Sequence, residues 1–287
     1  MASQDHIRNP IEWGWGQLSH AALTVGSLPR SLRGSDYAPL PAVRRIGVGD
    51  LKDALSKGLD DFEAYRTDVL FLCLVYPLAG IALLWLTFGY DMLPLIFPIA
   101  SGFALIGPVA AVGLYEMSWR REQGSRITWM DAFGVVRSPG FGAILVLGLA
   151  LIAIFLLWLL TASLIYQLTL GPEPPVSVGA FVHDVFTTRA GWTMIVMGIG
   201  IGFLFAALVL TISVVSFPLL LDRDVGLPTA VSTSIRAVAE NPGPMAMWGL
   251  IVAGSLVIGS IPAFLGLIVV MPVLGHATWH LYRKVVR

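Results

Sequence analysis

The sequence predicts an all-α polytopic membrane protein with six transmembrane helices, arranged as three hairpins that each follow a short amphipathic interfacial helix. Hydrophobic residues make up 56% of the 287 residues and charged residues only 13%, whereas about a quarter of a soluble domain is charged. Five long stretches contain no Asp, Glu, Lys or Arg, and each exceeds the roughly 20 apolar residues that cross a bilayer. These stretches are Val69–Tyr90, Met92–Tyr115, Gly140–Leu170, Ala190–Leu221 and Asn241–Tyr282.

The last uncharged stretch contains 42 residues and must fold back on itself. As one helix it would be about 63 Å long at roughly 1.5 Å per residue, twice the thickness of a hydrocarbon core of about 30 Å. Ser260-Ile261-Pro262 is the best turn, because proline disfavours helix in the residue before it and removes a backbone donor. The six predicted spans are therefore about 69–89, 92–115, 141–168, 191–220, 244–259 and 262–282.

The distribution of cations orients these spans. With six crossings, 17 of the 18 Lys and Arg residues lie on one side of the membrane, and Arg189 alone lies on the other. The positive-inside rule places the cation-rich side in the cytoplasm. We therefore expect a protein of the bacterial inner membrane with a cytoplasmic N-terminus and a cytoplasmic C-terminus.

A short amphipathic segment precedes each predicted hairpin, at residues 49–62, 127–140 and 226–244. In the first, apolar residues recur every three to four positions, which predicts one apolar stripe on a helix. The helices that return to the cytoplasm also resemble one another, since Pro108 aligns with Pro272 and Glu116 with His280. This pattern predicts an internal repeat; a chance alignment of hydrophobic sequences is the alternative.

His276 and His280 lie one helical turn apart in "MPVLGHATWHLYRK", so they share a helix face. They are the candidates for a metal or haem site, which needs imidazoles directed into a cavity. The repeat favours a different interpretation, a polar helix end at the lipid headgroups, and we expect no catalytic residue, cofactor or metal. Aromatic and cationic side chains anchor such ends, and the predicted interfacial anchors are Trp119, Arg120, Arg121, Trp279, Arg283 and Lys284.

Residues 1–48 form a predicted cytoplasmic segment ahead of the transmembrane domain at 49–287. Trp13 and Trp15 stand two residues apart, and Arg30 and Arg33 lie in a stretch rich in Pro and Gly. Aromatic and Arg side chains are favoured anchors at protein interfaces, so these four residues are the candidate partner contacts. The alternatives are an extended or disordered segment.

Two stretches, "LPAVRRIGVGDLKDALSKGLDDFEAYRTDVLFLCLVYPLAG" and "SIRAVAENPGPMAMWGLIV", carry a family resemblance. From about residue 40 to 284 the chain resembles a proteobacterial family of predicted six-helix integral membrane proteins that carry a domain of unknown function. The resemblance implies the fold and the localisation, and brings no catalytic residues. Some members carry a cytochrome-oxidase-like label, which we do not adopt because the transmembrane histidines that haem and copper require are missing.

The expected function follows from these observations. No nucleotide-binding, hydrolase or metalloprotease motif is found, and a net charge of zero argues against nucleic acid as a partner. We expect a non-enzymatic accessory subunit, assembly factor or scaffold. Its expected partners are membrane lipids and other integral membrane proteins, with a respiratory or other multi-subunit bioenergetic complex among the candidates. A permease for a neutral or hydrophobic small solute is the alternative.

Overall fold

The computed structural model describes residues 41–64, 74, 77, 78, 80–82, 85, 92–125 and 128–287, and within them the backbone is helical apart from turns and one isolated bridge. Three of its helical segments are long and apolar enough to cross a membrane: α9 (Phe141–Thr169), α14 (Pro242–Ser260), and α11 (Arg189–Ser213) together with α12 (Ser216–Asp222). The expectation of an all-helical chain with apolar helices suited to a membrane is confirmed. The first predicted crossing, 69–89, lies largely outside the described residues.

The predicted span 92–115 is broken rather than continuous. A short 3-10 helix, η1 (Leu93–Leu95), leads into α6 (Ile96–Ala100), and α7 (Gly102–Ala110) follows. The segment Leu93–Ala100 and the segment Ala104–Ala110 differ in direction by 43°. A polar contact supports the bend, because Ser101 Oγ donates to the Pro98 carbonyl (2.6 Å) and accepts from Trp158 Nε1 of α9 (2.9 Å). The bent pair is a fourth candidate span.

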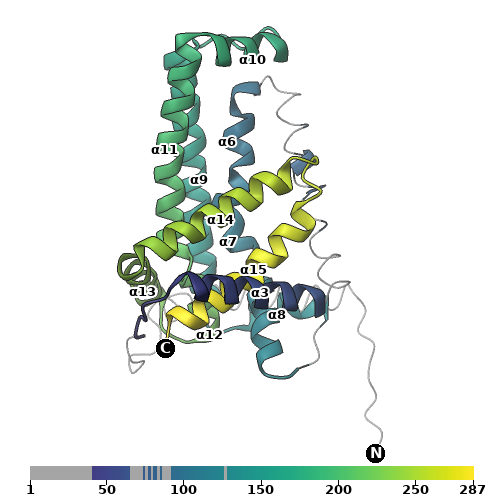
Figure 1. Ribbon diagram of the computed structural model, residues 1–287, viewed down its shortest axis with the longest axis vertical. Coiled ribbons are helices and arrows are strands. Elements are labelled where there is room, and N and C mark those ends of the chain that lie inside the picture. The colour runs from purple at the N-terminus through teal and green to yellow at the C-terminus, as the bar shows by residue number, and fades with distance from the viewer. Residues whose placement is uncertain are drawn as a thin grey trace, which may run out of the picture.

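Helices occupy all three segments predicted to precede hairpins. These are α3 (Val48–Ala64), the 3-10 helix η2 (Trp129–Arg137) and α13 (Leu227–Glu240). Figure 1 shows α3 lying across one end of the bundle, whereas α10 (Val178–Thr187) lies across the opposite end of α9 and α11.

The packed core is concentrated at the α3 end of the molecule. There α3 lies against α15 (Leu267–Val285), with α8 (Val112–Glu122) beside them. Gly58 permits the close approach of α3, because a Cβ at this position would lie 2.6 Å from the Ala277 backbone nitrogen. The largest side chains with almost no exposed surface in this region include Trp279, Tyr282, Phe217, Leu51 and Leu114.

The long helices present apolar side chains to their surroundings. Leu160 of α9, Phe203 of α11 and Leu250 of α14 are 59%, 65% and 72% exposed. Exposed apolar area of this extent is typical of a surface that lipid or another protein covers.

The last predicted span, 262–282, overlaps α15, which is not among the candidate spans of the described residues. The turn between the last two helices occupies residues 261–266, so it begins within the predicted Ser260-Ile261-Pro262 and extends four residues beyond it.

Candidate functional site

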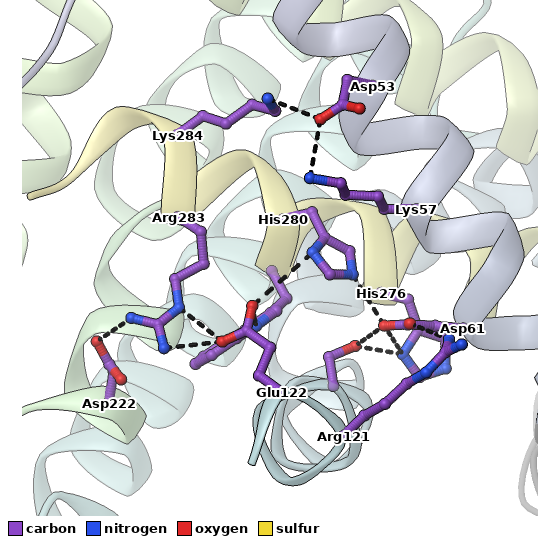
Figure 2. A network of polar contacts seen from close by, with 12 residues as sticks. Asp53, Lys57, Asp61, Arg121, Glu122, Asp222, His276, His280, Arg283 and Lys284 are labelled. Atoms are coloured by element: carbon purple, nitrogen blue, oxygen red, sulfur yellow. Dashed lines mark hydrogen bonds and ion pairs between the residues drawn. The ribbon is translucent and has the colours of Figure 1, made fainter. Parts of the chain in front are cut away.

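The strongest candidate site is a cluster of buried polar side chains where α3, α8 and α15 meet (Figure 2). Asp61 comes from the last turn of α3, and His276 and His280 come from successive turns of α15. Residues of α8 approach from the third side, Ser118 and Arg121 among them. α8 and α15 each contribute two residues three or four positions apart, which a helix places on one face.

Asp61 is the centre of the cluster, with a side chain only 6% exposed. Its Oδ2 accepts a hydrogen bond from Ser118 Oγ (2.6 Å) and lies 2.9 Å from His280 Nε2, while Oδ1 accepts from Arg121 Nη1. Burial opposes the charged form, but hydrogen bonds from His280 and Ser118 outweigh it and leave the pKa of Asp61 below its usual range. Asp61 is therefore a carboxylate that holds three partners.

The ionised Asp61 fixes the protons on its neighbours. A carboxylate only accepts hydrogen bonds, so Ser118 donates its single proton to Asp61, and His280 donates from Nε2. Ser118 Oγ then accepts from His276 Nδ1 at 2.7 Å. The other ring nitrogen of His276, Nε2, is buried and forms no hydrogen bond within the part of the chain that the structure describes.

A second set of contacts joins the end of α15 to α8 and α12. Arg283 donates from Nε and Nη2 to Glu122 Oε2 (2.9 and 2.8 Å) and from Nη1 to Asp222 Oδ2 (3.1 Å). Tyr282 donates to the same Asp222 oxygen at 2.6 Å, and Trp279 Nε1 donates to Glu122 Oε1 at 3.1 Å. The carboxylates of Glu122 and Asp222, which lie far apart in the sequence, thus accept hydrogen bonds from three side chains near the end of α15.

Lys284 connects α15 to the first half of α3. Its Nζ lies 2.7 Å from Asp53 Oδ2 and 3.5 Å from Asp50 Oδ1, and Lys57 also pairs with Asp53 (3.1 Å; Figure 2). The hydrogen bond to Asp53 is the main reason why the pKa of Lys284 is raised. The ion pairs of Lys284 with Asp53 and Asp50 are more exposed than Asp61, so they add less to the stability of the protein.

Arg120 joins α8 to η2. It contacts Glu116 Oε1 and Asp131 Oδ1, each at 2.7 Å. Glu116 is almost fully buried, and burial raises its pKa despite the guanidinium beside it. Thr128 and Asp131 form a capping box that starts η2.

The structure places the predicted anchors in different surroundings. Trp279 is fully buried and Trp119 is partly buried against the core. The four predicted cationic anchors all pair with carboxylates of the protein itself: Arg120, Arg121, Arg283 and Lys284. They are therefore part of the structure that holds the helices together, whatever they contribute at the headgroups.

The two predicted histidines converge on one carboxylate. His280 contacts Asp61 directly and His276 Nδ1 lies 3.9 Å from the same oxygen. Within the described residues no group of three or more His, Cys, Asp or Glu has the arrangement of a metal site. The candidate partner contacts Trp13, Trp15, Arg30 and Arg33 lie outside the described residues.

Sequence reasoning assigned no site role to Asp61, Ser118, Glu122 or Asp222. A signal for Asp61 was present, because Leu51, Ala54, Gly58 and Asp61 follow one another at three- and four-residue spacing on the buried side of α3. An acidic residue on an apolar stripe indicates a buried carboxylate that needs a partner.

The cluster joins three helices. Asp61, Ser118 and His276 are almost completely buried, and their contacts connect α3, α8 and α15. A cavity of about 180 Å³ occurs elsewhere, between the start of η1 and the end of α9, and is lined by Met92, Pro94, Leu95, Ser163, Tyr166, Gln167, Pro172 and Pro174.

Comparison with known proteins gives one result that agrees with this structure. A family model described as "Predicted integral membrane protein (DUF2189)" matches residues 96–222, which run from α6 to the end of α12. Searches of curated proteins and of solved structures find no match. Over residues 96–222 the chain is thus similar to a family of predicted integral membrane proteins of unknown function, which agrees with the resemblance seen in its sequence.

Proposed function

We propose that this protein is a non-enzymatic accessory subunit, assembly factor or scaffold that acts by binding other integral membrane proteins. The observation that carries the proposal is the surface of α11. Gly200 lies on this helix between Val196 and Phe203, which are exposed on the same face, and a Cβ added to Gly200 would meet no atom within 4 Å. Bare glycine backbone on an exposed apolar helix lets a second helix approach closely.

The polar residues of the described chain support the same interpretation. The ionisable groups around Asp61 and Arg283 are engaged with one another, so they stabilise the molecule and are not free for acid–base chemistry. We place the protein in the bacterial inner membrane with both chain ends in the cytoplasm, because that orientation keeps 17 of the 18 Lys and Arg residues on one side. Lipids and a multi-subunit complex, such as a respiratory one, are its proposed partners.

A permease for a neutral or hydrophobic small solute is the second candidate. The broken helix α6–α7 supports it, because discontinuous helices line the substrate sites of many transporters. The cavity of about 180 Å³ beside η1, with Ser163 and Gln167 in its lining, would admit a small solute.

Purification in a mild detergent tests the main proposal. The expected result is a protein partner at a fixed stoichiometry, which is lost in the variant Gly200→Leu. Gly243→Leu is the matched control, because Gly243 has equally open surroundings but lies at the start of α14. A partner that survives Gly200→Leu would contradict the assignment of this surface.

Two further measurements distinguish the remaining possibilities. Deletion of residues 1–45 should release the partner if the N-terminal segment also contacts it. Saturable counterflow of a neutral solute in proteoliposomes that contain only this protein would instead favour the permease.

A further inference from the structure

The hairpin formed by α14 and α15 begins and ends at the same end of the molecule. At its start, Asn241 accepts a hydrogen bond from the Ile46 nitrogen (2.8 Å) and donates to the Arg44 carbonyl (3.1 Å), just before α3. At its end, Val286 forms an antiparallel bridge with Val43. Both feet of the hairpin are therefore fixed beside α3.

The part of α15 that remains for the membrane is short. Its second half, from His276 to Lys284, is enclosed by α3 and α8 through the polar cluster. Leu267–Gly275 is left, nine residues that rise about 13 Å as a helix. That length is less than half of a hydrocarbon core of about 30 Å, so this segment does not reach the opposite surface.

Figure 1 agrees with this limit. The α14–α15 turn lies well short of the end of the molecule where α10 crosses α9 and α11, and α14 is inclined to those two helices. A helix of 19 residues is long enough to cross a membrane when upright, but an inclined one gains less depth.

The turn itself is apolar. Ile261 is 77% exposed and Leu265 is 57% exposed, and residues 261–266 contain no polar side chain. By contrast, the connection between α9 and α11 contains Glu173, His183 and Asp184, as expected for a segment in contact with water. A turn with exposed Ile and Leu and no polar residue is suited to a hydrocarbon environment.

Most backbone nitrogens of the turn donate to carbonyls within the hairpin. The nitrogens of Phe264, Leu265 and Leu267 donate to the carbonyls of Ser260, Pro262 and Phe264, and the Ala263 nitrogen donates to the Ile261 carbonyl. Pro262 has no N–H to satisfy, and the Ser260 hydroxyl donates to the Leu256 carbonyl. Backbone inside a bilayer must be satisfied in this way, because no water is available.

Two glycines make the turn narrow. A Cβ at Gly266 would lie 2.7 Å from the Gly259 Cα, so the two helices meet backbone to backbone directly below the tip. Small residues permit this approach in membrane helices.

We propose that α14 and α15 form a re-entrant hairpin, which enters the bilayer from the α3 side, contacts lipid acyl chains with its tip and returns to the same side. Ile258, Ile261, Leu265 and Val269 form the lipid-facing surface, and all four are at least 46% exposed. The hairpin replaces the last two predicted crossings. Like a pair of full crossings, a re-entrant hairpin returns the chain to the side from which it entered. The two chain ends therefore stay on one side of the membrane. The inference is independent of the proposed function.

Cysteine accessibility in sealed vesicles of each orientation tests the proposal. The single native cysteine, Cys73, is first replaced by serine. Ala263→Cys then probes the tip, Val176→Cys marks the α10 side and Ser56→Cys marks the α3 side, and all three positions are exposed. A membrane-impermeant maleimide should label the two marker positions from opposite sides, and label position 263 about tenfold more slowly from either side, because an apolar environment disfavours the reactive thiolate.

Each other outcome overturns the proposal. Rapid labelling of position 263 from the Val176 side indicates two full crossings, and rapid labelling from the Ser56 side places the hairpin outside the lipid. A fluorophore at position 263 supplies the second measurement: lipids brominated on the acyl chains should quench it strongly. Weak quenching together with slow labelling would mean that protein covers the tip. Leu265→Cys repeats the test at a second tip position, in case Ala263→Cys does not fold.

Discussion

Replacement of Asp61 by asparagine should destabilise the protein by about 2 kcal/mol. Asparagine keeps the size of the side chain and one acceptor oxygen, but it removes the charge that binds Arg121 and His280. Hydrogen bonds to charged groups contribute roughly 1.5–3 kcal/mol each, and loss of one partner of a buried ion pair costs about 3–5 kcal/mol. The Arg121 side chain is 36% exposed, so solvent compensates part of its lost pairing and the lower end of these ranges applies.

Unfolding by titration of SDS into mixed micelles measures this difference. Asp60→Asn is the matched control, because Asp60 is the neighbouring residue on α3 and is exposed; its effect should stay within about 0.5 kcal/mol, as for most surface substitutions. If Asp61→Asn unfolds at the same SDS fraction as the control, the buried carboxylate does not hold α3 in place and the interpretation of the cluster is wrong.

The same variant has a defined pH dependence. The pKa of Asp61 is lower in the folded protein than in the unfolded chain, so its contribution is complete above the usual carboxyl range near 4. It is lost as the pH falls through that range towards the folded pKa. The natural protein should therefore lose stability below about pH 4 more steeply than Asp61→Asn. Parallel curves for the two proteins would contradict the assignment of this effect to Asp61.

Three other substitutions have expected outcomes in the same unfolding assay. Gly58→Ala should destabilise by about 1–3 kcal/mol through overpacking against α15, whereas Gly49→Ala on the same helix has open space and should not destabilise; equal effects would refute the close contact. Tyr282→Phe should lose about 1.5 kcal/mol with the hydrogen bond to Asp222, and an unchanged midpoint would show that this bond is not stabilising. Ala263→Gly should stabilise by up to about 1 kcal/mol, because Ala263 has a φ of 50° that costs an L-residue roughly 1–2 kcal/mol; a lower midpoint would mean that the strain is absent.

The sequence was sufficient for features that depend on local pattern. Long uncharged stretches predicted α9, α11 and α14, and apolar spacing predicted α3. Ser260-Ile261-Pro262 predicted the last turn because proline acts on its immediate neighbours. Each of these features is encoded within a few consecutive turns of chain.

The sequence was not sufficient for features that depend on pairing between distant segments. Arg283 and Trp279 were assigned to the headgroups from the properties of their own helix, whereas Glu122 supplies the partner for both. The partner of His280 is Asp61, 219 residues away. Hydrophobicity along one helix does not reveal which carboxylate another helix brings to it, and this choice determined the candidate site.

The depth reached by the last two helices could not be predicted from composition either. The stretch 241–282 is long enough for two crossings, and nothing in its hydropathy shows that α3 occupies the second half of α15. The break in the predicted span 92–115, by contrast, has a local signal in the sequence. Pro98 and Pro108 lie within this span, and each removes a helical hydrogen bond.

The contact between α3 and α15 has a consequence for biosynthesis. A ribosome makes α3 well before its apolar partner α15, and the segment of chain after α15 also returns to α3, because Arg287 donates its backbone nitrogen to the Ala42 carbonyl. Until α15 has been made, the side of α3 that carries Leu51 and Phe62 must rest on lipid headgroups or on a chaperone. Termination of translation before α15 would leave that surface uncovered, and such truncated chains are expected substrates for membrane proteases.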